Sequence, residues 1–275
     1  MTNSQSALLV RGRWIVTGAA DADPTLTDGA VLVRDGLIEA TGDWSTLRSQ
    51  HPDATVLGSE RVAVLPGMVS AHHHAAGVSH IQQGVPDDVL EPWLLDLRRM
   101  RPTDPYLDTL LTSARLLRSG VTSVVEMHQC RGAAEATVER VHRALRGYEQ
   151  AGIRVAFAPG VANQNPLISA ASPAEMAAFL DSLPPAARQA AEAFLPGPEA
   201  LQPDAYLALM NTLCQQYAEH PRIHVWLGPP GPNWVTDDFL VRIAELARTY
   251  QTGIQTHVSE SLYEKLYGPR TYGGA

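Results

Sequence analysis

The sequence predicts an α/β protein, in which a small β domain precedes an incomplete TIM-like (β/α) barrel of about five strands. The first observation is a change in the pattern of predicted secondary structure. Residues 1–65 are rich in strand-like segments, whereas predicted helices and strands alternate from residue 66 onward. The second is length. A complete eight-stranded barrel takes about 250 residues, and 275 minus 65 leaves 210. We therefore predict two domains, residues 1–65 and residues 66–275.

The N-terminal domain is expected to be built around a hairpin. Residues 30–40 contain two β-rich halves separated by Asp35-Gly36, a dipeptide that favours a tight hairpin turn. Pro66-Gly67 marks the end of this domain. The other expected elements are a strand at 7–16, a short helix at 44–49 and two short strands at 55–57 and 61–65.

The second domain repeats a joint in which a helix ends at Gly and an apolar strand follows at once. Gly favours the left-handed conformation that ends helices, so each joint predicts one step of a parallel sheet. The joints are Gly120 before residues 121–127, Gly152 before 153–158 and Gly253 before 254–257. Apolar residues 68–71 and 223–228 add two strands, and the Ala-rich excursion at 172–202 is expected to be an inserted helical pair.

One helix is expected to bury an apolar face. Its apolar residues recur at helical spacing and predict packing against the sheet. They are Leu107, Leu110, Leu111, Ala114 and Leu117.

Composition excludes several classes of function. The formal net charge is −8 and the pI about 5.6, without a run of Lys or Arg that could bind nucleic acid. No segment approaches the roughly 18 apolar residues of a membrane span, and the start lacks a leader pattern. We expect a cytoplasmic protein. Cys130 and Cys214 are too few for a disulfide scaffold and are expected to be buried thiols.

Two histidines stand at the end of the first predicted barrel strand. His72 and His74 are two residues apart, so strand alternation points both imidazoles to one face, and His73 points to the other. Such a pair can bind one metal ion. By itself His-x-His is a weak signal, since the chain has 10 His.

A third histidine, His257, ends the strand predicted at residues 254–257, and the ends of barrel strands converge. Glu260 follows three residues later. A carboxylate beside a metal can move the proton of an activated water. The alternative is that Glu260 lies in the first turn of a helix capped by Ser259. The local sequence does not choose between them.

Three separated motifs then carry a resemblance that spans essentially the whole chain. They are PGMVSAHHH at residues 66–74, SGVTSVV at 119–125 and THVSE at 256–260. Together they resemble the amidohydrolase superfamily in its deaminase and chlorohydrolase branch, which holds cytosine, guanine and adenosine-type deaminases and triazine hydrolases. In that branch a composite β-sandwich precedes the barrel, so residues 1–65 resemble its N-terminal part.

The resemblance implies a site and a reaction. His72, His74 and His257 would bind one divalent ion, zinc or iron, and Glu260 would shuttle protons. The implied activity is hydrolysis of a C–N bond, other than a peptide bond, in a small cyclic or aromatic molecule by metal-activated water. A chlorohydrolase using the same water is the alternative. A two-metal site is disfavoured, because it needs a Lys before His257 and Lys265 is the only Lys.

Two further residues of the family are not found. The branch also uses a His from strand six and an Asp from strand eight, but only 18 residues (275 minus 257) follow His257, and none is His or Asp. We therefore expect the N-terminal portion of such an enzyme, whose activity alone is in doubt. An inactive fragment or metal-binding pseudoenzyme is the competing hypothesis.

The expected partner is a small-molecule substrate, and a homo-oligomer is a further expectation. Adenosine-type relatives contact substrate through a Glu before the Trp of the first loop and a His after strand four. Here Pro92 and Pro230 occupy the aligned positions, which argues against a nucleoside. Trp93 and His128 are the candidate substrate-binding residues, although a His near a sheet edge is more often structural.

Overall fold

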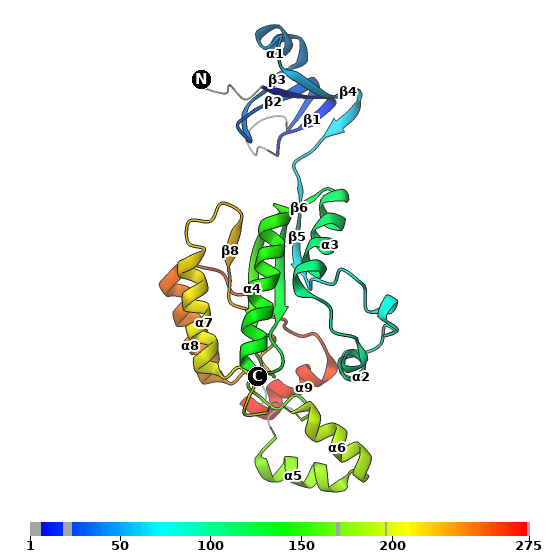
Figure 1. The fold of residues 1–275 in the computed structure, drawn as a ribbon, viewed down its shortest axis with the longest axis vertical. Coiled ribbons are helices and arrows are strands. Elements are labelled where there is room, and N and C mark those ends of the chain that lie inside the picture. The colour runs from blue at the N-terminus through cyan, green and yellow to red at the C-terminus, as the bar shows by residue number, and fades with distance from the viewer. Residues whose placement is uncertain (1–6, 19–23, 169–170, 196, 274–275) are drawn as a thin grey trace. The chain divides into compact units, whose positions relative to one another are not determined.

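A computed structural model describes residues 7–18, 24–168, 171–195 and 197–273. The chain divides into two compact units, Met1–Met68 and Val69–Ala275, which are coloured from blue to red along the chain in Figure 1. None of the described helices is long and apolar enough to cross a membrane.

The first unit is a four-stranded sheet with one helix. Its strand order is β3-β2-β1-β4, in which β1 pairs antiparallel with β2 and parallel with β4. Asp35 and Gly36 join β2 to β3 with φ of 52° and 77°, which confirms the predicted turn. The elements are β1 (Leu8–Val16), β2 (Thr25–Arg34), β3 (Leu37–Asp43), α1 (Trp44–Gln50) and β4 (Thr55–Val64).

Strand β4 corrects one prediction, because residues 55–64 form a single strand where two short strands were expected. The interruption is a bulge, since Gly12 pairs with Ser59 whereas Trp14 pairs with Ala63. Gly58 has φ of 77°, and a Cβ there would lie 2.2 Å from the carbonyl oxygen of Arg11. The residues between the two predicted strands are therefore part of one continuous strand, because β4 pairs with β1 on both sides of the bulge.

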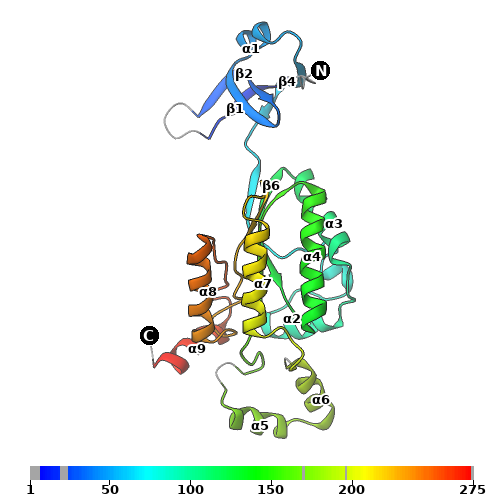
Figure 2. The same cartoon turned by 60° about the vertical axis from the view of Figure 1, so that its left-hand side comes forward.

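The second unit contains a sheet whose strands follow chain order, β5-β6-β7-β8, with parallel pairing from β6 to β8. Helices α3, α4, α7 and α8 alternate with these strands and cover one face of the sheet (Figure 2). The strands are β5 (Met68–His73), β6 (Val121–Gln129), β7 (Arg154–Gly160) and β8 (Ile223–Val225). The helices are α3 (Pro105–Arg118), α4 (Ala134–Ala151), α7 (Pro203–Gln216) and α8 (Asp237–Tyr250).

Shorter elements lie beyond the end of the sheet at which the strands finish (Figure 1). The excursion forms two helices, as predicted, and the first begins with a capping box between Ser172 and Glu175. These elements are η1 (Ile81–Gln83), α2 (Leu90–Asp96), η2 (Leu97–Arg99), α5 (Pro173–Ser182), α6 (Pro185–Phe194) and α9 (Leu262–Tyr272).

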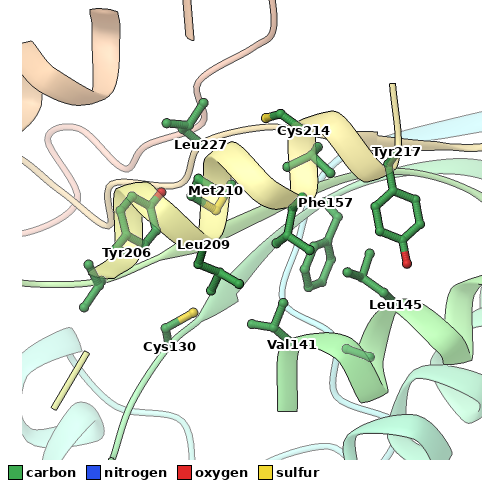
Figure 3. Packing of buried hydrophobic residues seen from close by; sticks show 14 of the residues in the cluster. Cys130, Val141, Leu145, Phe157, Tyr206, Leu209, Met210, Cys214, Tyr217 and Leu227 are labelled. Atoms are coloured by element: carbon green, nitrogen blue, oxygen red, sulfur yellow. The ribbon is translucent and has the colours of Figure 1, made fainter. Parts of the chain in front are cut away.

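The main core lies between the sheet and its helices. Phe157 of β7 is fully buried between Leu145 of α4 and Met210 of α7 (Figure 3). The hydroxyl of Tyr206 is also buried and donates to the carbonyl of Pro159 at 2.8 Å, so α7 is tied to the end of β7. The predicted buried thiols are confirmed, because both cysteines are free and buried.

Helix α3 corrects a second prediction, because its apolar face is largely exposed. Leu107 is 61% exposed, and Leu111 and Leu117 are each 40% exposed. The buried face is Thr109, Thr112 and Ser113. A Cβ on Gly147 of α4 would lie 2.8 Å from the Cβ of Thr109, so the two helices meet through small residues. Hydrophobic spacing identified a face, but the neighbouring helix decided which face is covered.

The third Gly joint also differs from expectation. Helix α8 ends with Gln251 in the left-handed conformation, with φ of 49°, instead of at Gly253. A Cβ on Gly253 would lie 2.4 Å from the ring of Trp226. Gly253 is therefore required by close packing, whereas Gly120 and Gly152 have the predicted positive φ of 86° and 74°.

The segment at 254–257 corrects the predicted fifth strand, because it forms only an isolated parallel bridge between Leu227 and Ile254. The N–H of Leu227 donates to the carbonyl of Gly253 at 3.0 Å, and the N–H of Gln255 donates to the carbonyl of Leu227 at 2.9 Å. Pro229 and Pro230 come next and have no N–H. The ladder therefore stops after one residue, and β8 ends earlier than the predicted 223–228.

Candidate metal centre

Three histidines from distant parts of the second unit meet in space. One ligand atom from each of His72, His74 and His257 lies within 4.8 Å of the others. The Nε2 atoms of His74 and His257 are 3.1 Å apart, and the ring centroids are 4.9 to 5.2 Å apart. Among the described residues, this is the group of His, Cys, Asp or Glu whose geometry can hold a metal ion.

Backbone carbonyls orient two of these rings. The Nδ1 of His74 lies 3.0 Å from the carbonyl oxygen of Met127 in β6, and the Nδ1 of His257 lies 2.7 Å from that of Pro230. A carbonyl only accepts, so Nδ1 carries the hydrogen in both rings. The Nε2 atom of each ring then carries an unprotonated lone pair, and the two Nε2 atoms face each other.

This tautomer assignment is a test of whether a cation fits the site. Two unprotonated Nε2 atoms facing each other at 3.1 Å repel unless a cation lies between them. Zinc to nitrogen bonds of 2.0 to 2.1 Å in a tetrahedral site place two ligand nitrogens about 3.4 Å apart. The donor set and its spacing therefore suit a divalent ion.

Burial favours the neutral form of His72 and His74, which is the form that metals bind. Burial is the largest cause that lowers the pKa of His74 to about 4, and the neighbouring His257 and His72 contribute to that lowering. Burial also lowers the pKa of His72, again with a contribution from His257. Neutral imidazole at pH 7 has its lone pair available, so metal binding there does not have to displace a proton.

Glu260 lies between this cluster and the start of α9. Its backbone N–H donates to the carboxylate of Glu264 at 2.6 Å. Burial raises the pKa of Glu260, His257 opposes the rise, and Glu264 and Glu91 add to it. Helix α9 is capped by Ser261, not by Ser259. The capped-helix interpretation of Glu260 is therefore wrong in detail, because Glu264 occupies the first-turn position.

Comparison with known families gives a match to the Amidohydrolase family over residues 63–273. The chain belongs to this family. A shorter match over residues 29–54 is to the bacterial Imidazolonepropionase-like composite domain, which lies within the first unit.

Individual relatives of this amidohydrolase chain are longer. A 5-methylthioadenosine/S-adenosylhomocysteine deaminase of Nitratidesulfovibrio vulgaris is 25% identical over 275 residues, which is 97% of this chain and 52% of the relative. A zinc-bound adenosine deaminase from Xanthomonas campestris has TM-score 0.66 at 21% identity, over 98% of this chain and 53% of its own. The zinc complex of atrazine chlorohydrolase from Arthrobacter aurescens has TM-score 0.69 at 20% identity, with 98% and 56% covered. The chain spans about half the length of these proteins.

Among the described residues, the hydrogen-bond and ring contacts of the candidate substrate-binding residues, His128 and Trp93, are with residues other than the three clustered histidines. The Nδ1 of His128 lies 3.1 Å from the carboxylate of Glu126, and its ring packs on Phe157. Trp93 of α2 packs edge-on against His80, with centroids 5.1 Å apart. A contact of either residue with substrate stays a prediction.

Glu126 is a buried acid that no sequence motif identified. Its side chain is 1% exposed, and its second oxygen has no hydrogen-bond partner. The charge of Glu126 acts on His73 and His74, whose pKa values it raises against the larger lowering by burial. A single acidic residue within the strand Val121–Gln129 was the available signal.

Two other contributors were missed, because one acts through its backbone and the other lies in a helix far away in the sequence. Pro230 was interpreted as a position that lacks a hydrogen-bonding side chain. In the structure its carbonyl oxygen accepts from Nδ1 of His257. Glu91, in the first turn of α2 and two residues before Trp93, accepts a hydrogen bond from the Ser261 hydroxyl at 2.5 Å, and its charge acts on Glu260. No pattern of side chains in the sequence reveals a carbonyl contact.

Proposed function

We propose that this chain is the metal-binding part of a hydrolase that acts on C–N bonds, other than peptide bonds, in small cyclic or aromatic molecules. The observation that supports this most is the pair of Nε2 atoms of His74 and His257, which face each other at 3.1 Å while both Nδ1 atoms lie on carbonyls. The family match and the deaminase relative support the reaction class.

The proposed fold is a (β/α) barrel of which this chain supplies the first strands. Sheet order β5-β6-β7-β8 agrees with the sequential order of a barrel, and the bridge at Ile254 marks where a fifth strand would add. The relatives, at about twice the length, have room for the other strands.

His72, His74 and His257 would hold one divalent ion, with zinc first and iron as the alternative. When bound, such an ion lowers the pKa of water and supplies hydroxide at neutral pH. Burial raises the pKa of Glu260, so this carboxyl group holds a proton more readily than an exposed Glu does. We propose that it accepts the proton of the nucleophile and delivers it to the leaving group.

A purine nucleoside is the proposed substrate class. The name of the Nitratidesulfovibrio vulgaris deaminase cited above supports this. The argument against a nucleoside depended on Pro92 and Pro230, which lack hydrogen-bonding side chains. Glu91 weakens the part that concerns Pro92, because it supplies a carboxylate whose charge acts on Glu260. The chlorohydrolase alternative has no specific contact in its favour, because the similarity to the atrazine enzyme is one of fold.

The test is metal content followed by product analysis. Purified protein should bind about one zinc per chain, and His74→Ala and His257→Ala should lose it. Substrate screening should compare 5-methylthioadenosine with chlorotriazines, with ammonia and chloride as the respective products. Absence of zinc binding would overturn the metal site. Zinc binding without either product would favour the metal-binding pseudoenzyme.

A further inference from the structure

Gln255 connects the segment that carries His257 to the strand that carries His72. Its amide nitrogen lies 2.8 Å from Nδ1 of His72 and 3.3 Å from the carbonyl oxygen of Ala71. The amide oxygen is buried and has no hydrogen-bond partner. A buried acceptor without a partner costs about 1 to 3 kcal/mol, so it calls for an explanation.

The partner of His72 differs in kind from the partners of the other two rings. His74 and His257 face carbonyls, which only accept, whereas an amide can present either a donor or an acceptor. With the amide nitrogen toward Nδ1, His72 must carry its hydrogen on Nε2. That tautomer has no lone pair at Nε2 and cannot use it to bind a metal.

A turn of the amide by 180° gives His72 the tautomer that can bind a metal through Nε2. The oxygen of Gln255 would then accept from Nδ1 of His72, and Nε2 would become a bare lone pair, as it is in His74 and His257. Amide nitrogen and oxygen have nearly the same shape, so the turn needs little space. Its cost is the 3.3 Å contact with the carbonyl of Ala71, and the amide nitrogen then takes the buried position in which the oxygen has no partner.

We propose that Gln255 is a positioning residue, whose amide oxygen accepts the Nδ1 hydrogen of His72 and so fixes the tautomer and orientation of that metal-binding ring. This inference depends on the proposed metal site. Outer partners of this kind typically change metal affinity or activity 10- to 100-fold when they are removed. The competing role is purely structural, in which the amide only ties residue 255 to Ala71.

Substitution of Gln255 by Leu and by Glu separates the two roles. Gln255→Leu removes donor and acceptor, and zinc affinity should fall about 10- to 100-fold. Gln255→Glu provides only acceptors, so it keeps the bond from His72 and should retain zinc affinity within about threefold. If the tie to Ala71 were the function, Glu would fail as Leu does, because a carboxylate cannot donate to a carbonyl.

Zinc affinity would be measured by competition with a chromophoric chelator, and the absorption spectrum of the cobalt form would report ligand geometry. Thr256→Val is the matched control, because Thr256 is adjacent and its hydroxyl contacts only the carbonyl of His257. It should leave zinc affinity unchanged. In a His72→Ala background, Gln255→Leu should have no further effect, because Gln255 acts through His72.

Each outcome decides one question. Zinc binding by the unsubstituted protein with unchanged affinity in Gln255→Leu would overturn the positioning role alone. Equal losses in Gln255→Leu and Gln255→Glu would assign Gln255 to the structural tie and overturn the proposal as well. If the unsubstituted protein takes no zinc, the proposed metal site fails first and this inference fails with it. Should Gln255→Leu not fold, the zinc affinity of Gln255→Glu decides.

Discussion

At the scale of single residues, carbonyl oxygens orient two rings of the proposed metal site. Met127 and Pro230 accept from the Nδ1 atoms of His74 and His257, which sets both tautomers before any ion binds. Because the acceptors belong to the backbone, their position depends on the strands and on the turn after Gly228, not on side-chain rotamers. A site organised in this way should bind its ion with little rearrangement of the rings.

Glu260 is the residue whose role is most directly testable. In a completed enzyme that contains this chain, Glu260→Gln should retain metal and lower turnover by about two to four orders of magnitude, the usual contribution of general acid and base catalysis. Turnover of 5-methylthioadenosine and zinc content would be measured on the same preparations. Turnover equal to that of the unsubstituted protein would leave Glu260 as a residue that precedes the helix and nothing more.

His128 allows a test of structure against substrate binding. Its ring is the hydrogen-bond partner of the buried Glu126 carboxylate, so His128→Ala should lower the free energy of unfolding by about 3 kcal/mol. Urea unfolding measures this. Combining it with Glu126→Gln should cost less than the sum of the two single changes. A raised KM with unchanged stability would instead support the predicted substrate contact.

At the scale of elements, the most constrained connection is the one between β8 and the His257 segment. Pro229 and Pro230 end the ladder, so the segment is held by one bridge, by the Gln255 contacts and by packing of Gly253 on Trp226. Few contacts therefore position His257. Changes at these contacts should affect metal binding more than their distance from the rings suggests.

Gly253→Ala tests this connection. The added Cβ would lie 2.4 Å from the Trp226 ring, so overpacking should cost about 1 to 3 kcal/mol of unfolding free energy, and zinc affinity should also fall. Gly42→Ala in β3 is the matched control. A Cβ there meets only side-chain atoms of Leu47 at 3.8 and 3.9 Å, which is ordinary contact, so stability should be unchanged or raised. Equal effects of the two changes would contradict this account.

At the scale of the whole molecule, exposed apolar surface on α3 predicts association. Leu107 and Leu111 are 61% and 40% exposed although they lie on the apolar side of the helix. Sheet edges at β5 and β8 add unpaired backbone groups, which favour pairing with another chain. We expect residues 1–275 to self-associate. Size-exclusion chromatography should show species above 29.7 kDa, and Leu107→Glu with Leu111→Glu should shift them toward monomer. Compact monomer before substitution would refute the expectation.

Much of the architecture follows from local patterns. The Asp35-Gly36 turn needs only two residues with positive φ, and the α4 stop at Gly152 needs only one. Both are decided within a few residues of chain, so both could be predicted from the sequence. The convergence of His72 and His74 with His257 could also be predicted, because parallel strands bring their carboxyl ends to one edge.

Other features depend on which surfaces meet. Spacing alone identified a leucine face on α3, but the close approach of α4 at Gly147 selected the threonine face for burial. The segment at residues 254–257 has the composition of a strand, yet the prolines of its neighbour cannot donate to it. In each case the deciding atoms belong to another element.

The sequence by itself determined the alternation of helices and strands, the His-x-His at the end of β5 and the acid that follows His257. These properties depend on alternation, helix stops and turn residues, which act over a few positions. Only the tertiary structure decided which ring nitrogen carries hydrogen, that Glu91 joins Glu260 and that Gln255 faces His72. Those contacts join residues far apart in sequence, often through the backbone, so no local pattern encodes them.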